Sequence, residues 1–167
     1  MTAIVSAVRA VLLRDLDALA AQVRAYPGDA DPWKTVPGIA NPGGTLALHL
    51  AGNLRAFVGA ALGQTGYVRD RDAEFSTRGL SRAEILARIA AARLEVDQAL
   101  ARLPEPALAQ PFPQEVGGAR LTTGQLLLHL VSHLGYHLGQ VDYHRRAVTG
   151  GGSVPGIIAA KGLVGGA

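Results

Sequence analysis

The chain of 167 residues contains no cysteine. This absence excludes disulfide scaffolds, thiolate zinc sites and cysteine nucleophiles. Imidazole and carboxylate groups are then the only strong metal ligands that the sequence offers. Any metal that the protein binds is therefore expected to be a hard or borderline ion.

The sequence has little excess charge and few aromatic residues. Lys and Arg number 16 against 13 Asp and Glu, the net charge is +3, and aromatics make up 5% of the chain. The longest basic run is Arg145-Arg146, whereas nucleic-acid-binding surfaces concentrate basic residues and interleave stacking aromatics. We therefore expect no nucleic-acid partner.

A long uninterrupted hydrophobic run is also missing at the start of the chain. Arg9, Arg14, Asp15 and Asp17 interrupt the apolar N-terminal stretch, which has no basic region ahead of it. Such a stretch resembles neither a signal peptide nor a membrane span. The length and the 49% hydrophobic content fit a single globular domain. The sequence predicts a soluble, cytoplasmic protein with no membrane partner.

Four segments have the apolar spacing of amphipathic helices, and strand signals are weak. The first segment spans residues 3–25 and ends before Tyr26-Pro27-Gly28. The second begins at Thr45, which can serve as an N-cap, and ends at the glycines that follow Leu62. These two segments are joined by a loop rich in proline and glycine.

The third and fourth segments each begin with a capping box, in which a Ser or Thr and a Glu or Gln three residues later satisfy free backbone N–H groups. Proline-containing stretches separate these segments from their neighbours. The boxes and their helices are Ser81 with Glu84, ahead of a helix to Leu103, and Thr122 with Gln125, ahead of a helix to about Ala147.

Together these segments predict an all-α fold, a four-helix bundle with long connecting loops. The bundle is expected to span residues 1–149, and a glycine-rich tail over residues 150–167 is expected to be irregular. All three connections are longer than usual bundle loops, so the order of up and down helices is open and the loops are candidates for lining a site.

The histidines are strongly clustered. Of the five in the chain, His129, His133, His137 and His144 lie within sixteen residues on the last helix, and His49 lies on the second. Residues four apart on a helix differ by about 40° and are about 6 Å apart along its axis. One metal ion can therefore be held by His129 with His133 or by His133 with His137, and the spacing leaves both pairs open.

A pair of histidines on one helix needs at least one more ligand to hold a divalent ion firmly. His49 is the one imidazole outside the last helix, and it shares a helix face with residues that can point into the bundle. Three imidazoles would leave an open position on Zn²⁺, Ni²⁺ or Fe²⁺, where water can become a nucleophile at neutral pH.

Four further residues are candidates for supporting such a site. Asn53 lies one turn beyond His49, and Gln140 lies nearly one turn beyond His137, so either amide can orient a ligand imidazole. Trp33, the only tryptophan, can form an apolar wall of the pocket or anchor its loop. His129 is expected near the site but held by hydrogen bonds rather than by the metal.

Two stretches of the sequence resemble the DinB-like superfamily of small bacterial four-helix-bundle proteins. They are Gly44-Thr45-Leu46-Ala47-Leu48-His49-Leu50-Ala51-Gly52-Asn53 and His129-Leu130-Val131-Ser132-His133-Leu134-Gly135-Tyr136-His137-Leu138-Gly139-Gln140. In that family a histidine of the second helix and an H-x-x-x-H pair of the last helix bind a divalent metal, and a Gly-Gln dipeptide follows. The resemblance implies His49, His133 and His137 as ligands. The sequence departs from the family at Leu138, where an arginine often stands.

The resemblance also implies a range of activities. Its members include metal-dependent transferases that use mycothiol, bacillithiol or glutathione, a maleylpyruvate isomerase, and hydrolases. We therefore expect a metal-dependent thiol transferase or hydrolase that acts on a small electrophilic substrate, with Zn or Ni as the metal, Fe as another candidate, and a low-molecular-weight thiol as a second cofactor. The alternative is a non-catalytic bundle that binds a ligand or forms a homodimer, because the sequence offers no clear acidic or nucleophilic partner near the ligands.

Overall fold

The computed structural model of the protein describes residues 3–163. Within this range the fold is all-α, as expected, and the only β-type pairings are isolated bridges in the connections. The long helices are α1 (Ala3–Arg24), α2 (Gly43–Leu54), α4 (Arg82–Arg102) and α5 (Thr123–Thr149). The short ones are η1 (Asp31–Trp33), η2 (Arg55–Ala60), α3 (Arg71–Ser76), η3 (Glu105–Ala109) and η4 (Ala160–Leu163).

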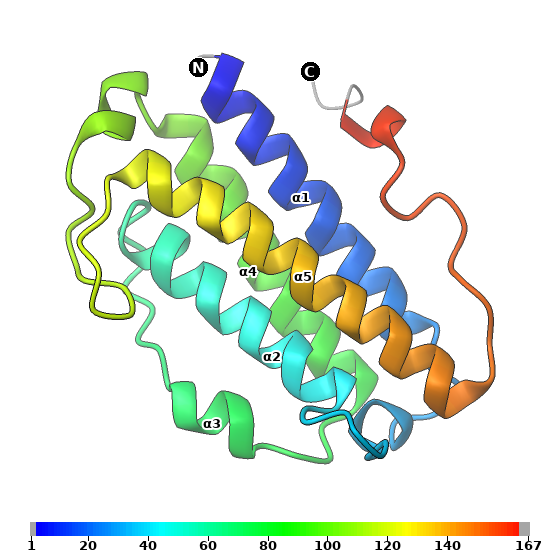
Figure 1. Cartoon of the computed structure of the whole chain (residues 1–167). Coiled ribbons are helices and arrows are strands. Elements are labelled where there is room, and N and C mark those ends of the chain that lie inside the picture. The colour runs from blue at the N-terminus through cyan, green and yellow to red at the C-terminus, as the bar shows by residue number, and fades with distance from the viewer. Residues whose placement is uncertain (1–2, 164–167) are drawn as a thin grey trace.

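The four long helices form a bundle in which α4 and α5 each pack against both α1 and α2 (Figure 1). The helices α1 and α5 run in one direction, and α2 and α4 run in the other. Ion pairs from Arg9 to Asp97 and from Asp17 to Arg93 join α1 to α4 in this antiparallel arrangement. The structure therefore settles the helix order that the sequence left open.

The parallel orientation of α2 and α4 explains the longest of the connections. A chain that leaves the end of α2 must travel back along the bundle before it can start α4 in the same direction. The short helix α3 lies in this returning segment and packs against α2. Sequence periodicity did not predict α3, which is only six residues long.

Both predicted capping boxes are confirmed. Ser81 accepts from the backbone of Glu84 at the start of α4, and Thr122 accepts from the backbone of Gln125 at the start of α5. In each case the side chain three residues after the cap also accepts from the backbone N–H of the cap residue. The α5 helix ends at Gly150, whose left-handed backbone (φ 66°) suits glycine.

The predicted N-cap role of Thr45 is wrong. The helix α2 begins two residues earlier, at Gly43 after Pro42, so Thr45 lies inside the first turn and is fully buried. The start of α2 packs tightly on other parts of the chain, because a Cβ atom on Gly43 would lie 2.9 Å from His144 Nδ1 and closer still to the Tyr26 hydroxyl. Tertiary contact rather than side-chain capping fixes this helix start.

The second helix also differs from expectation beyond Leu54, because its continuation η2 is a π-helix. Ala61 donates to the carbonyl of Ala56, five residues earlier, and the helix then ends in a turn. Gln64 and Gly66 have positive φ angles there, which agrees with the predicted stop after Leu62. Single π-helical turns are rare and frequently lie near functional sites.

The tail beyond α5 runs beside the bundle, and its last described element, η4, packs on α1 (Figure 1). Ile157 contacts the core, whereas Val164 lies outside the described residues. The division into a bundle over 1–149 and a tail over 150–167 stays a prediction. None of the helices within residues 3–163 has both the length and the apolarity needed to cross a membrane.

Candidate metal centre

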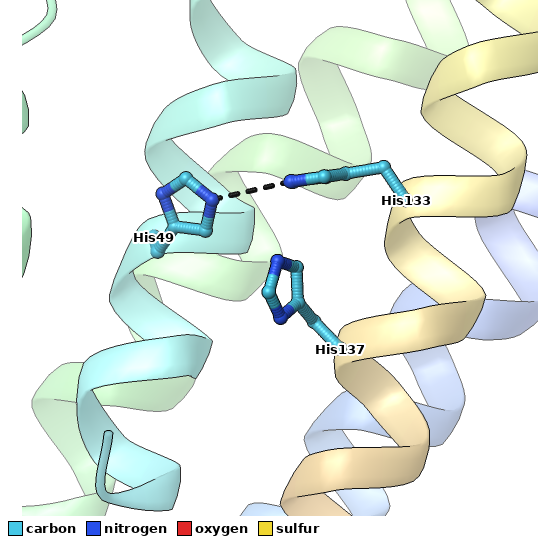
Figure 2. Close-up of side chains that lie close together, drawn as sticks. All are labelled: His49, His133 and His137. Carbon is cyan, nitrogen blue, oxygen red and sulfur yellow. Dashed lines mark hydrogen bonds between the residues drawn. The ribbon is translucent and has the colours of Figure 1, made fainter. Parts of the chain in front are cut away.

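Three histidines from two helices meet inside the bundle. His49 comes from α2, and His133 and His137 come from successive turns of α5 (Figure 2). One ring nitrogen of each lies within 4.8 Å of the corresponding nitrogens of the other two. Two stretches of chain that are 84 residues apart therefore place three donor atoms around one point.

The spacing of these nitrogens suits a metal ion of ordinary size. With metal–nitrogen bonds of about 2.0–2.1 Å and tetrahedral angles, two ligand nitrogens lie about 3.3–3.4 Å apart. The Nε2 atoms of His49 and His133 are 3.3 Å apart. The remaining separations reach at most 4.8 Å, so those nitrogens would need to approach by no more than about 1.5 Å to share one ion.

Hydrogen bonds at the outer nitrogens fix the protonation of two of the rings. His137 Nδ1 lies 2.6 Å from Gln140 Oε1, an acceptor, so Nδ1 carries the proton. His49 Nδ1 lies 3.0 Å from Glu74 Oε2 and donates to that carboxylate in the same way. In a neutral ring with this tautomer, the lone pair lies on Nε2, and the Nε2 of His49 lies 3.3 Å from His133 Nε2. Neutral imidazoles with a bare nitrogen are the form that binds metal.

Burial keeps His133 and His137 neutral. It lowers the pKa of His133 to about 4, and the neighbouring rings of His137, His49 and His129 add to this effect. Burial also lowers the pKa of His137, although its bond to Gln140 acts in the opposite direction. At neutral pH both rings are therefore uncharged and available as ligands.

Glu74 is the residue that the sequence analysis missed. It lies in α3, is 6% exposed, and receives two hydrogen bonds from Arg69, each of 2.7 Å, besides the one from His49. Burial alone would raise the pKa of Glu74, but the bonds from Arg69 and His49 outweigh it and hold the pKa below its usual value. The one local sequence signal for the helix that carries Glu74 is Asp70, four residues earlier. It caps the start of α3 by accepting from the Ala73 backbone N–H.

The other predicted residues lie at different distances from the three rings. Gln140 bonds to His137 as described, and His129 is exposed with its ring centroid 5.7 Å from that of His133. Asn53 is buried one turn beyond His49, and its Oδ1 has no hydrogen-bond partner. Trp33 packs on Gly44 at the start of α2 and donates to the Leu80 carbonyl, so it anchors its loop.

Asp142, an acidic residue of α5, bonds to residues outside the cluster. It accepts from Gln22 of α1 and from Arg145 of its own helix. His144 is completely buried, and its two nitrogens bond to the Tyr26 hydroxyl and to the Lys34 carbonyl. Hydrogen bonds within the protein therefore satisfy this histidine.

Comparison with models of known protein families gives a match for this chain. The family model of the DinB superfamily matches residues 12–141. The chain belongs to the DinB superfamily. The matched range of this DinB-superfamily protein contains His49, His133, His137 and Gln140. Comparison with curated proteins and with solved structures gives no match.

Proposed function

We propose that this DinB-superfamily protein is a metal-dependent enzyme in which His49, His133 and His137 hold one divalent ion. The observation that carries the proposal is the convergence of three imidazole nitrogens, two of them on rings whose outer nitrogens are already bonded. The ligand set is borderline in softness, which suits Zn²⁺ or Ni²⁺ and also accommodates Fe²⁺. Three protein ligands are the number found in catalytic zinc sites, which keep a position open.

When bound, the metal supplies a Lewis acid that activates water or a low-molecular-weight thiol for attack on a small electrophilic substrate. The protein's own groups orient the rings: Gln140 holds His137, and Glu74 holds His49. Both α5 ligands are half-buried rather than sealed in the core, so part of each side chain is open to solvent. A thiol transferase and a hydrolase are the two reaction classes that we propose.

Two buried oxygen atoms beside His49 support a site that takes up small polar molecules. Thr45 Oγ1 and Asn53 Oδ1 lie one turn before and one turn after His49 on α2, and neither has a hydrogen-bond partner within the described part of the chain. Buried polar atoms are nearly always satisfied by protein or by ordered water. We infer that water or substrate satisfies them.

The alternative is a non-catalytic bundle whose histidines satisfy one another. One observation favours it, because His49 and His133 are within hydrogen-bonding distance through their Nε2 atoms. That bond accounts for only one pair, however, and leaves the Nε2 of His137 pointing at the same space. In this alternative, a second copy of the chain would cover Leu128, Tyr136 and Tyr143, large residues on α5 that are each more than 60% exposed.

Metal analysis of the purified protein tests the proposal. We expect about one divalent ion per chain in the unmodified protein and a near-complete loss in His133→Ala. His129→Ala is the matched control, because His129 lies on the same helix one turn away but outside the three-nitrogen group. Equal metal content in both variants would reject the site.

A reaction screen then separates the two activities. The metal-loaded protein is offered small electrophiles with mycothiol, bacillithiol or glutathione, and separately with water alone. Turnover that requires a thiol indicates a transferase, and turnover in water indicates a hydrolase. If the metal-loaded protein turns over no substrate and light scattering finds a dimer, the non-catalytic alternative is favoured.

A further inference from the structure

We propose that Glu74, held in place by Arg69, is a positioning residue that aims His49 Nε2 at the metal. The inference rests on the proposed metal site and adds to it a carboxylate from a segment outside the helices that supply the ligands. It assigns a function to the returning segment between α2 and α4, whose short helix α3 carries Glu74.

Three hydrogen bonds fix the orientation of the Glu74 carboxylate. One carboxylate oxygen accepts from Arg69 Nε, and the other accepts from both Arg69 Nη2 and His49 Nδ1, at 2.7–3.0 Å. Arg69 therefore binds the carboxylate with both arms of its guanidinium, the geometry that gives the strongest and most directional arginine–carboxylate pairs. His49 Nδ1 is the third donor to a carboxylate that is already fixed.

An ionised carboxylate accepts hydrogen bonds and donates none, so it selects one tautomer of His49. The proton must lie on Nδ1, and Nε2 is left bare on the side that faces His133 and His137. Arg69 Nη2 also lies 3.3 Å from His49 Nδ1, but both atoms are then donors and this contact is not a hydrogen bond. Carboxylates that accept from the outer nitrogen of a metal-bound histidine fix its orientation and raise its basicity.

The α2 helix is shaped to admit this carboxylate. A Cβ atom on Gly52 would lie 2.8 Å from the Glu74 carboxyl carbon and closer to Oε1, so only glycine leaves the room. The ring of Phe75, the next residue of α3, packs on His49 with centroids 4.9 Å apart. Glu74 and Phe75 thus restrain the His49 ring through a hydrogen bond and through packing.

The chain provides a matched control in a second glycine–glutamate–arginine group. Glu95 of α4 accepts from Arg55 Nε and Nη2 at 3.0 and 2.8 Å and packs on Gly59, where a Cβ atom would lie 3.1 Å from the Glu95 Cβ. Both glutamates are largely buried and both bind an arginine of the segment that follows His49. Both bonds from Arg55 go to Glu95 Oε1, and among the described residues no histidine bonds to Glu95. Its variants therefore report the loss of a largely buried glutamate–arginine pair without a histidine bond.

The test compares Glu74→Ala and Glu74→Gln with Glu95→Ala and Glu95→Gln. In metal-free protein, imidazole ¹⁵N chemical shifts show which nitrogen of His49 carries the proton. We expect Nδ1–H in the unmodified protein and in both Glu95 variants, and a shift of the proton toward Nε2 in Glu74→Ala. A His49 tautomer that is unchanged in Glu74→Ala would overturn the inference, whether or not the protein binds metal.

The Zn²⁺ dissociation constant, measured by competition with a chelating indicator, gives the second readout. Glu74→Ala is expected to weaken binding about 10–100-fold, as is typical when such a carboxylate is lost, while both Glu95 variants stay within about twofold. Glu74→Gln keeps the shape and one acceptor but loses the charge, so we expect a smaller loss of about threefold or more. The Glu74→Gln variant still tests the inference if Glu74→Ala does not fold.

The two readouts separate the failure of this inference from the failure of the proposed function. If the unmodified protein binds no Zn²⁺, Ni²⁺ or Fe²⁺, the proposed function fails and the tautomer of His49 alone decides the role of Glu74. If the unmodified protein binds metal and Glu74 and Glu95 variants bind it equally tightly, the metal site stands and the positioning role of Glu74 is rejected.

Discussion

Imidazoles lie at two places where α2 faces α5, and the protein satisfies them differently. At the start of α2, His144 is sealed in the core, donates from Nε2 to the Lys34 carbonyl and accepts at Nδ1 from the Tyr26 hydroxyl. Farther along α2, the outer nitrogens of His49 and His137 make such bonds, whereas the inner Nε2 of His49 contacts another imidazole, that of His133, at 3.3 Å. The comparison shows what a purely structural histidine looks like in this fold, and that the central cluster is built otherwise.

The difference lies in where the unused nitrogens point. Both nitrogens of His144 have protein partners, so burying the ring leaves no polar atom without a hydrogen bond. In the cluster, three inner nitrogens face the same small volume. The pair within hydrogen-bonding distance joins His49 to His133, which leaves the third ring without such a contact there. Leaving several imidazoles in this arrangement is costly unless something shared satisfies them. A metal ion is a partner that serves all three at once.

Removing His133 should have the largest effect on metal binding, the property that distinguishes the cluster from His144. We expect His133→Ala to weaken Zn²⁺ binding by more than the 10–100-fold typical of an outer carboxylate, because it removes a direct ligand. Calorimetric titration measures this change, and chemical denaturation of the metal-free protein should show little loss of stability. Unchanged binding would mean that the cluster resembles His144 and is structural.

Removing the Tyr26 hydroxyl should have the opposite effect. In Tyr26→Phe the buried Nδ1 of His144 loses its donor, which should lower the free energy of unfolding by about 1–3 kcal/mol. The dissociation constant for Zn²⁺ should stay the same, since Tyr26 contacts none of the three ligands. Urea denaturation checks the first expectation. A weakened metal site in this variant would show that the two places are coupled.

The burial of His144 should make the stability of the fold depend on pH. Burial lowers the pKa of His144, so the unfolded chain binds a proton near the ordinary value of about 6.5 while the folded chain does not. Stability is therefore present above pH 6.5 and falls as the pH drops below about 6.5. Denaturation of metal-free protein across this range should show a shallower decline for His144→Gln than for the unmodified chain. Equal slopes would show that His144 titrates normally.

The smallest effect is expected at two glycines of α5. Gly135 and Gly139 lie among the cluster residues, but both are exposed and a Cβ atom on either would meet nothing within 4 Å. Each Gly→Ala change should stabilise the fold by about 0.5–1 kcal/mol, because glycine is a poor helix former. Thermal melts measure the gain. A loss of Zn²⁺ affinity instead would show that the cluster needs this open surface.

Local sequence signals were sufficient for the parts of the fold that depend on local interactions. The capping boxes at Ser81 and Thr122 mark the starts of α4 and α5, because the groups that form them are three residues apart. The N-cap prediction at Thr45 was wrong because the start of α2 depends on contacts that are not local. The helix begins where Gly43 packs against Tyr26 and His144, which are far away in sequence.

For the site, helical spacing gave the candidate ligands of α5 but left two pairings, and the family resemblance selected His133 with His137. Their convergence with His49 is seen in the structure. Glu74 could not be found in this way, since its position depends on α2 and α4 being parallel and on the path of the chain between them. That path is a tertiary property with no periodic pattern in the sequence.

Anomalous diffraction from crystals grown with Zn²⁺, recorded on both sides of the zinc absorption edge, shows directly whether the three histidines share one ion. We expect one strong peak per chain, about 2.0–2.1 Å from one nitrogen each of His49, His133 and His137. Strong zinc peaks found only elsewhere, such as between His129 and His133, or no peak at all, would contradict this expectation.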